Sequence, residues 1–281
     1  MNKDNIKSLC QRLLLRLLLL ALLAVMLYPL LWTIMSSFKT STEYLTDPYA
    51  LPSVLHFGNY ANALEGSNLL GTIWNTIYVL IVSTSAVLVC SIPCSYALSR
   101  YRFPGSRVLL SVLIGGLFVS SSYIIVQLFL ELRELKLLNN LTALALIYAT
   151  FQLPFSCFLL TNYMKEIPRE YEEAAVLDGC STFGVLLNVI MPMSKSNILT
   201  VGMISILTGW SEYNVALVLV ADPAKQTFPV GLANLYAVQS YATDWGALFA
   251  GITIAMIPTI ALFVIGEKYV IKGMSVGGLK G

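Results

Sequence analysis

Long windows without charged residues constrain the fold of this chain more than any other feature of its 281 residues. Five windows of 22 to 34 residues contain no Asp, Glu, Lys or Arg, and a sixth, Ser196–Ala221, contains only Glu212. A bilayer core of about 30 Å is crossed by about 20 helical residues, so each window is long enough to span it. The windows therefore predict an all-α membrane protein with six transmembrane helices. The five uncharged windows are Leu17–Phe38, Gly66–Ser99, Val108–Leu130, Leu137–Met164 and Trp245–Gly266.

The composition argues against the main alternative classes. Only 11% of the residues are charged, whereas soluble domains contain about 25%. A net charge of +2, with no basic run longer than two residues, does not favour nucleic-acid binding. The five cysteines form no CxxC pair and the chain has a single histidine, His56, so neither a metal site nor a redox site is indicated.

The span boundaries divide the chain into a membrane domain, residues 17–270, and two flanking segments, residues 1–16 and 271–281. The first window is longer than the apolar core of a signal peptide, and no small-residue cleavage site follows Phe38, so we expect it to be retained. The expected spans are about 17–38, 70–98, 108–130, 139–163, 196–220 and 246–268.

The distribution of Lys and Arg predicts the orientation. With six spans, both termini and two of the loops lie on one side of the membrane, which then holds 13 of the 17 basic residues. Cytoplasmic segments carry this excess in membrane proteins. We therefore expect a multi-pass protein of the cell membrane with both termini in the cytoplasm.

The cytoplasmic loop between the fourth and fifth spans, residues 164–195, has the pattern of two short helices. Pro168 suits a first helical turn, and three glutamates follow where the helix dipole favours negative charge. Gly179 is a natural helix stop with positive φ, Ser181 or Thr182 suits the start of a second helix, and Pro192 is expected to end it. The residues alone leave two interpretations open, an interfacial hairpin that connects two spans or a docking element for a soluble partner.

One motif in this loop resembles the EAA motif of ABC importer permeases. Glu173, Ala174 and Ala175 are followed after three residues by Gly179, and nine residues later by Val189-Ile190-Met191-Pro192. The family pattern has Ile where this chain has Val189 and Leu where it has Met191. The resemblance implies the type I importer permease fold, in which this cytoplasmic two-helix loop couples to the ATPase subunit. The implied coupling residues are Glu172, Glu173, Ala174, Ala175, Asp178, Gly179 and Pro192.

Three further segments are similar to the maltose-type branch of carbohydrate importers. They are Ser99-Arg-Tyr-Arg-Phe-Pro-Gly105, Trp210-Ser-Glu-Tyr-Asn214 and the glycine-rich tail that ends at Gly281. The resemblance implies a binding-protein-dependent permease subunit that carries a sugar or oligosaccharide. Its implied partners are a homologous second permease, two ATPase subunits that use ATP and Mg²⁺, and an extracytoplasmic sugar-binding protein. We expect no cofactor and no catalytic activity in this chain, since the Gly-Lys pair of a phosphate-binding loop is absent from its sequence.

Glu212 is the one charged residue inside the six apolar windows. A charge in a membrane span is costly, so such residues usually face a cavity or a partner group. Trp210, Tyr213 and Asn214 lie beside it and, with Glu212, are candidates for the substrate pathway. A structural role for Glu212 remains open at this stage. Two other functions also remain open: a permease for another solute, and an ion-coupled secondary carrier that uses Glu212.

Overall fold

The computed structural model describes residues 3–66, 68–238 and 244–277, and every regular element within these ranges is a helix. This confirms the all-α prediction. The elements are α1 (Lys3–Ser36), α2 (Ser41–Thr46), α3 (Gly58–Gly66), α4 (Leu69–Arg100), α5 (Ser106–Gly116), α6 (Ser121–Glu134), α7 (Leu141–Glu166), α8 (Glu170–Leu177), α9 (Thr182–Val185), the π-helix η1 (Leu186–Ile190), α10 (Met191–Met193), α11 (Lys195–Trp210), α12 (Asn214–Leu219), the 3₁₀-helix η2 (Pro223–Lys225), α13 (Phe228–Val238) and α14 (Trp245–Gly277).

Four helical stretches among the described residues are each long and apolar enough to cross a membrane: Gln11–Ser36, Leu69–Arg100, Leu141–Glu166 and Trp245–Gly266. Two bent helix pairs raise the number of candidate spans to as many as six. The described helices are therefore compatible with six spans, and six remains a prediction.

The expected third span, residues 108–130, is not one helix. It is divided into α5 and α6, which are bent by 102° across residues 117–120. The Ser120 hydroxyl accepts a hydrogen bond from the Ser122 amide and so starts a new helix, as an N-cap residue does. The absence of charge predicts where a segment lies but does not determine whether its helix is continuous.

The expected fifth span, residues 196–220, is also interrupted. Helix α11 ends at Trp210, and the separate helix α12 begins at Asn214. Helix α11 is itself bent by 78° relative to the preceding segment Thr182–Met193. The Glu212 carboxylate, at the break, accepts hydrogen bonds from the Val215 and Ala216 amides and so satisfies free amide groups at the start of α12.

The ends of the chain differ slightly from the expected boundaries. Helix α1 already begins at Lys3, so the segment 1–16 is mostly helical and continuous with the first span. Helix α14 continues to Gly277, through most of the expected tail 271–281. Residues 239–243 and 278–281 lie outside the described residues.

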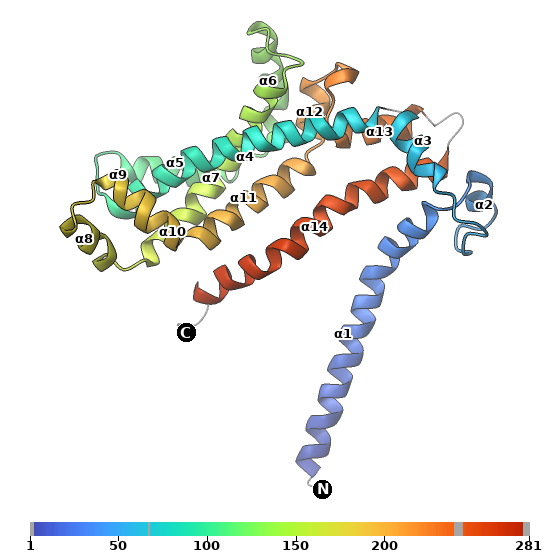
Figure 1. The fold of residues 1–281 in the computed structure, drawn as a ribbon, viewed down its shortest axis with the longest axis horizontal. Coiled ribbons are helices and arrows are strands. Elements are labelled where there is room, and N and C mark those ends of the chain that lie inside the picture. Colours follow the sequence, from blue (N-terminus) through green and yellow to red (C-terminus); the bar gives the residue numbers. More distant parts are fainter. Residues whose placement is uncertain (1–2, 67, 239–243, 278–281) are drawn as a thin grey trace. The chain divides into compact units, whose positions relative to one another are not determined.

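The chain forms two compact units, Met1–Ser67 with Asn234–Met256, and Asn68–Ala233 with Ile257–Gly281. In the second unit, α4 packs along α7 (Figure 1). Each end of this pair has its own apolar core. One core includes Tyr96, Met164, Ala175 and Ile190, and so joins α8 and η1 to the two long helices. The other core joins α6 and α12 to the opposite end of the pair.

In the first unit, the segment after α1 folds around a buried lysine. Lys39 is 1% exposed, and its ammonium group donates hydrogen bonds to the carbonyl oxygens of Asp47 and Pro48 at 3.2 and 2.9 Å. Helix α2 starts with a reciprocal capping box between Thr40 and Glu43. Capping and buried hydrogen bonds therefore give this segment, which follows an apolar span, a defined conformation.

Candidate functional site

Helix α8 ends where the loop sequence predicts, in a Schellman motif around Gly179. It begins at Glu170, with Arg169 as its N-cap, so Pro168 precedes the helix and does not occupy its first turn. The amide of Cys180 donates to the Ala175 carbonyl at 2.9 Å, and the amide of Gly179 donates to the Val176 carbonyl at 3.0 Å. Gly179 has a φ of +85°, in the left-handed region that glycine adopts at little cost. The prediction of a positive φ at this glycine is confirmed.

The inward face of α8 is fixed to the membrane helices. Ala175 is 7% exposed and belongs to the core that includes Met164 and Ile190. A small side chain at this position lets the helix backbone approach its neighbours closely. The first alanine of the motif, Ala174, is exposed, so the two alanines lie on different faces.

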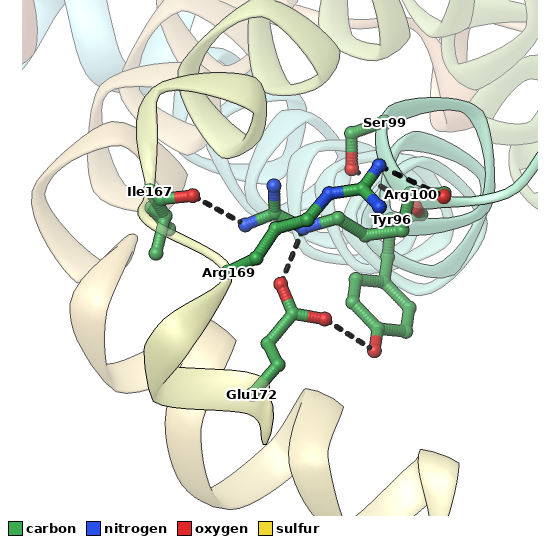
Figure 2. A network of polar contacts seen from close by, with 6 residues as sticks. All are labelled: Tyr96, Ser99, Arg100, Ile167, Arg169 and Glu172. Carbon is green, nitrogen blue, oxygen red and sulfur yellow. Dashed lines mark hydrogen bonds and ion pairs between the residues drawn. The ribbon is translucent and has the colours of Figure 1, made fainter. Parts of the chain in front are cut away.

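Glu172 forms the polar part of the same attachment (Figure 2). Its carboxylate forms an ion pair with Arg100, at the end of α4, and accepts a hydrogen bond from the Tyr96 hydroxyl at 3.1 Å. Arg100 also donates to the Ile167 carbonyl at 2.9 Å, and Arg169 donates to the Arg100 carbonyl at 3.5 Å. The Arg100 and Glu172 side chains are only 6% and 14% exposed, so the pair is largely shielded from water. The network connects the end of α4 to the start of α8.

The outward face of α8 presents the remaining coupling candidates. Glu173, Ala174 and Asp178 are exposed. Leu177, which the sequence analysis did not single out, is 89% exposed. Phe183, at the start of the second short helix, is 66% exposed. An exposed apolar residue on a short surface helix has no distinctive sequence pattern, so the sequence offered no signal for these two residues. The face therefore combines negative charge with exposed apolar side chains.

The second short helix begins as expected but does not end as expected. The Ser181 hydroxyl accepts a hydrogen bond from the Gly184 amide at 3.2 Å, which confirms Ser181 as the cap. Pro192, however, does not terminate the helix. The chain passes through the π-helix η1 and continues in α10 to Met193. The wider π turn precedes a residue that has no amide hydrogen, and such turns accommodate local irregularity. Pro192 is exposed.

A cavity of about 410 Å³, lined by both polar and apolar side chains, lies in the second unit. Side chains of α4, α7 and α11 line it together with the break between α5 and α6. The Gln152 side chain lines this cavity, and its amide nitrogen has no hydrogen-bond partner among the described residues. Hydroxyl, amide and carboxylate groups beside two phenylalanine rings give this cavity the surface that sugar hydroxyls and ring faces require. The polar side chains are Ser83, Ser120, Ser121, Tyr148, Gln152, Ser205, Thr208 and Glu212, and the rings are Phe151 and Phe155.

Glu212 lines this cavity, and its carboxylate is already occupied by the protein. One oxygen accepts a hydrogen bond from the Val215 amide at 3.0 Å. The other oxygen accepts from the Ala216 amide at 3.2 Å and from the Tyr148 hydroxyl at 2.9 Å. Glu212 therefore caps α12 and connects it to α7 at the edge of the cavity.

The other three pathway candidates lie elsewhere. Trp210 is 7% exposed and stacks on Phe228 with ring centroids 5.4 Å apart. Tyr213 packs against the core formed by α6, α7 and α12, and Asn214 is exposed at the start of α12. Of the four residues, the structure places Glu212 at the cavity and the other three outside its lining. The hydroxyl and amide groups of the lining come from α4, α7, α11 and the break between α5 and α6, which are far apart in the sequence.

Comparison with known proteins decides the family. Residues 91–276 match the model of the binding-protein-dependent transport system inner membrane component. The chain belongs to this family. It is 35% identical over 248 residues to the probable ABC transporter permease protein YurM of Bacillus subtilis, a match that covers 88% of this chain and 82% of the relative. It is 32% identical to the diacetylchitobiose uptake system permease protein NgcG of Streptomyces coelicolor, over 87% of this chain and 81% of that protein.

The fold agrees with a solved structure. The structure of a bacterial ABC transporter involved in the import of the acidic polysaccharide alginate contains a chain that superposes with a TM-score of 0.80. The match covers 96% of this chain and 98% of that chain, at 24% sequence identity. The predicted importer permease fold and the resemblance to the carbohydrate branch are confirmed. The family is an inner-membrane component of ABC transporters, and its permease subunit lacks an ATPase site of its own.

Proposed function

We propose that this chain carries a sugar or oligosaccharide into the cytoplasm as one of two permease subunits of an ATP-driven importer. Two copies of a separate ATPase subunit supply the free energy by using ATP and Mg²⁺, and an extracytoplasmic binding protein delivers the sugar. Both termini and α8 lie in the cytoplasm. The named relatives support a carbohydrate substrate, since NgcG belongs to a diacetylchitobiose uptake system. The excess of basic residues on one side of the predicted topology supports the orientation.

The attachment of α8 is the observation on which the coupling mechanism depends. Glu172 and Ala175 fix its inner face to α4 and to the core, while Glu173 and Leu177 face outward. A movement imposed on the outer face is therefore transmitted to Arg100 at the end of α4. Ser83 of α4 lines the 410 Å³ cavity, which is the proposed sugar pathway. A movement of α4 that follows closure of the ATPase subunits therefore changes the shape of this cavity. The ATPase subunit contacts the outer face of α8, and the rest of the permease contacts its inner face.

Reconstitution of the complete importer in vesicles tests this function. With ATP and binding protein supplied, sugar uptake is expected to continue when an uncoupler removes the proton gradient. Uptake that needs the gradient and proceeds without ATP would instead establish the ion-coupled carrier. Omitting the binding protein is the matched control, and it is expected to abolish uptake while leaving the ATPase subunits able to bind ATP.

Two glycine variants test the coupling assignment in the same vesicles. Gly179 and Gly105 have nearly equal positive φ values, +85° and +87°, and neither has an atom within 4 Å of an added Cβ. Replacing either by Ala therefore introduces only backbone strain, of about 1–2 kcal/mol. Gly179→Ala is expected to reduce sugar uptake per ATP hydrolysed by more than Gly105→Ala does, because Gly179 ends α8 and Gly105 lies outside it. Equal ratios in the two variants would contradict the role of α8.

A further inference from the structure

A large basic cleft lies beside the α8 attachment, and three of its basic residues, Arg102, Arg107 and Lys165, take no part in that attachment. It has a volume of about 1240 Å³ and is formed by the α4–α5 connection, the start of α5 and the α7–α8 connection. Leu69–Arg100 and Leu141–Glu166 are two of the apolar helices long enough to cross the membrane, and both end at this cleft. The cleft is therefore at a membrane boundary, on the side that the sequence predicts to be cytoplasmic.

Positive charge dominates the lining of the cleft. Arg100 is neutralised by Glu172, but four other cationic side chains, Arg102, Arg107, Lys165 and Arg169, are exposed. Arg102, Arg107 and Lys165 form no ion pair within the described part of the chain. The cleft also contains the carboxylates of Glu166 and Glu170, so its exposed side chains have four positive and two negative charges. An anionic group is the ligand that this excess favours.

The apolar part of the cleft points to a ligand with a hydrocarbon portion. Phe103, Val108 and Leu110 contribute to the lining. Val108 and Val112 on α5 are 66% and 64% exposed, and none of the residues of α5 is buried. Helix α5 thus provides an uncovered apolar surface that starts at the cleft and extends away from its basic side chains. A free phosphate would use only the basic part of this site, whereas an amphipathic anion would use both parts.

We propose that this cleft binds the headgroup of an anionic phospholipid from the cytoplasmic leaflet, with its acyl chains along α5. The phosphate lies among Arg102, Arg107 and Lys165, and Gly105 leaves the first amides of α5 without a side-chain cap on the same side. Juxtamembrane basic clusters bind anionic lipids in this way, and each basic residue contributes about a fivefold increase in affinity. Because the cleft shares Arg100 with the α8 attachment, a bound lipid also stabilises the end of α4.

Native mass spectrometry of the assembled importer tests this proposal with phosphatidylglycerol and phosphatidylcholine as probes. The variant Arg102→Gln/Arg107→Gln/Lys165→Gln removes three charges from the cleft without altering Arg100 or Glu172. The matched control, Arg133→Gln/Lys136→Gln/Lys225→Gln, removes three exposed charges that are outside the cleft. The cleft variant is expected to lose at least about tenfold of its affinity for phosphatidylglycerol, and the control to keep its affinity. Phosphatidylcholine binding is expected to change in neither variant.

Three results would overturn the proposal. Equal phosphatidylglycerol affinity in the cleft variant and the control would show that the cleft is not the lipid site. Competition by glycerol 3-phosphate as effective as that by phosphatidylglycerol would identify a soluble phosphate compound as the ligand. Loss of the ATPase subunit from the cleft variant, with lipid preference unchanged, would identify the cleft as a protein contact instead.

Discussion

Glu212 shows how a single charged side chain in an apolar segment is accommodated. A charge in an apolar window needs a cavity or a partner group, and the structure provides both for Glu212. Its two oxygens accept hydrogen bonds from two backbone amides of α12 and from the Tyr148 hydroxyl. These contacts explain why a carboxylate is suited to this position even without a bound solute. A role in capping α12 and a role in carrying protons predict different effects when Glu212 is replaced.

Replacement of Glu212 by Gln and by Leu distinguishes these roles. Gln retains one oxygen that accepts from an α12 amide and an amide group that can donate to Tyr148. Leu leaves two amides and one hydroxyl without an acceptor, at a cost of about 1–3 kcal/mol for each buried group. We expect Glu212→Gln to reduce sugar uptake mildly and Glu212→Leu to reduce it severely, at matched abundance in the membrane. Equal and complete loss would indicate proton coupling.

Tyr148→Phe is the control for this pair. It removes the hydroxyl that donates to Glu212 and leaves both amide hydrogen bonds of the cap in place. The expected loss of unfolding free energy is about 1 kcal/mol, well below that of Glu212→Leu. A loss as large as that of Glu212→Leu would mean that the Tyr148 contact, rather than the cap, is the important one.

The sequence predicted the coupling residues as a set but not the faces on which they lie. The motif resemblance identified Glu172 and Glu173 together, whereas the structure places Glu172 in an internal ion pair and leaves Glu173 exposed. The partner of Glu172 is Arg100, which is distant in the sequence, and local patterns do not indicate such a contact. Leu177 was missed because an exposed leucine on a surface helix has no distinctive sequence pattern.

At the scale of secondary-structure elements, α8 is held by a shielded ion pair, and a double-mutant cycle measures its strength. Glu172→Gln leaves the Arg100 guanidinium without its counter-charge, and removal of one partner of a buried pair costs about 3–5 kcal/mol. We expect Glu172→Gln and Arg100→Gln each to lower both thermal stability and sugar uptake. The double variant is expected to lose less stability than the two single variants lose together, because no unpaired charge remains. Additive losses would contradict the pair.

Helix α2 depends on a carboxylate whose pKa is strongly lowered. Hydrogen bonds from the Ser53 hydroxyl and from the Thr40 amide bring the pKa of Glu43 from 4.5 to about 2. The folded segment therefore favours the ionised form, so this stabilisation is complete above pH 4.5 and is lost as the pH falls toward 2.

Ser53→Ala is expected to raise the pKa of Glu43 and so to shift the loss of stability to higher pH. Hydrogen exchange of residues 40–53, measured between pH 2 and 4.5, should then be faster in this variant than in the wild type. Thr46→Ala is the matched control, because the Thr46 hydroxyl donates to the Thr42 carbonyl and not to Glu43. Faster exchange in Thr46→Ala of the same size would contradict the role of the carboxylate.

The helices themselves were predicted more accurately than their interruptions. The span predicted at 70–98 corresponds to Leu69–Arg100, and the span predicted at 139–163 corresponds to Leu141–Glu166, because uninterrupted apolar composition dominates both. The breaks at residues 117–120 and 211–213 occur inside apolar windows, where Ser120 and Glu212 cap the following helices. In an apolar window, a residue that caps a new helix has the same sequence pattern as a polar residue inside a continuous span. The packing of the surrounding helices decides whether the helix breaks or continues there.

At the scale of the whole molecule, this chain provides surfaces for partners rather than a complete transporter. The most apolar part of the candidate span Gln11–Ser36 is entirely unburied within this chain, and the outer face of α8 presents Leu177. Its fold is that of one permease chain of an ABC transporter. Lipid and partner subunits are therefore expected to cover most of the exposed apolar surface.

Assembly with the ATPase subunit is expected to depend on Leu177. Its side chain is 89% exposed, so replacement by Asp costs this chain little stability but places an additional charge in the expected interface. An unpaired charge buried in an interface costs about 2 kcal/mol or more, so Leu177→Asp should weaken association with the ATPase subunit at least about tenfold. Leu135→Asp, at a residue that is 65% exposed at the end of α6, is the matched control and should assemble normally. Co-purification measures both variants, and normal recovery of the ATPase subunit with Leu177→Asp would place the interface elsewhere.

The isolated chain should hydrolyse no ATP, and binding of its partner subunits should raise its thermal stability by mass action. Hydrolysis of ATP by the isolated chain would contradict its role as a permease without an ATPase site.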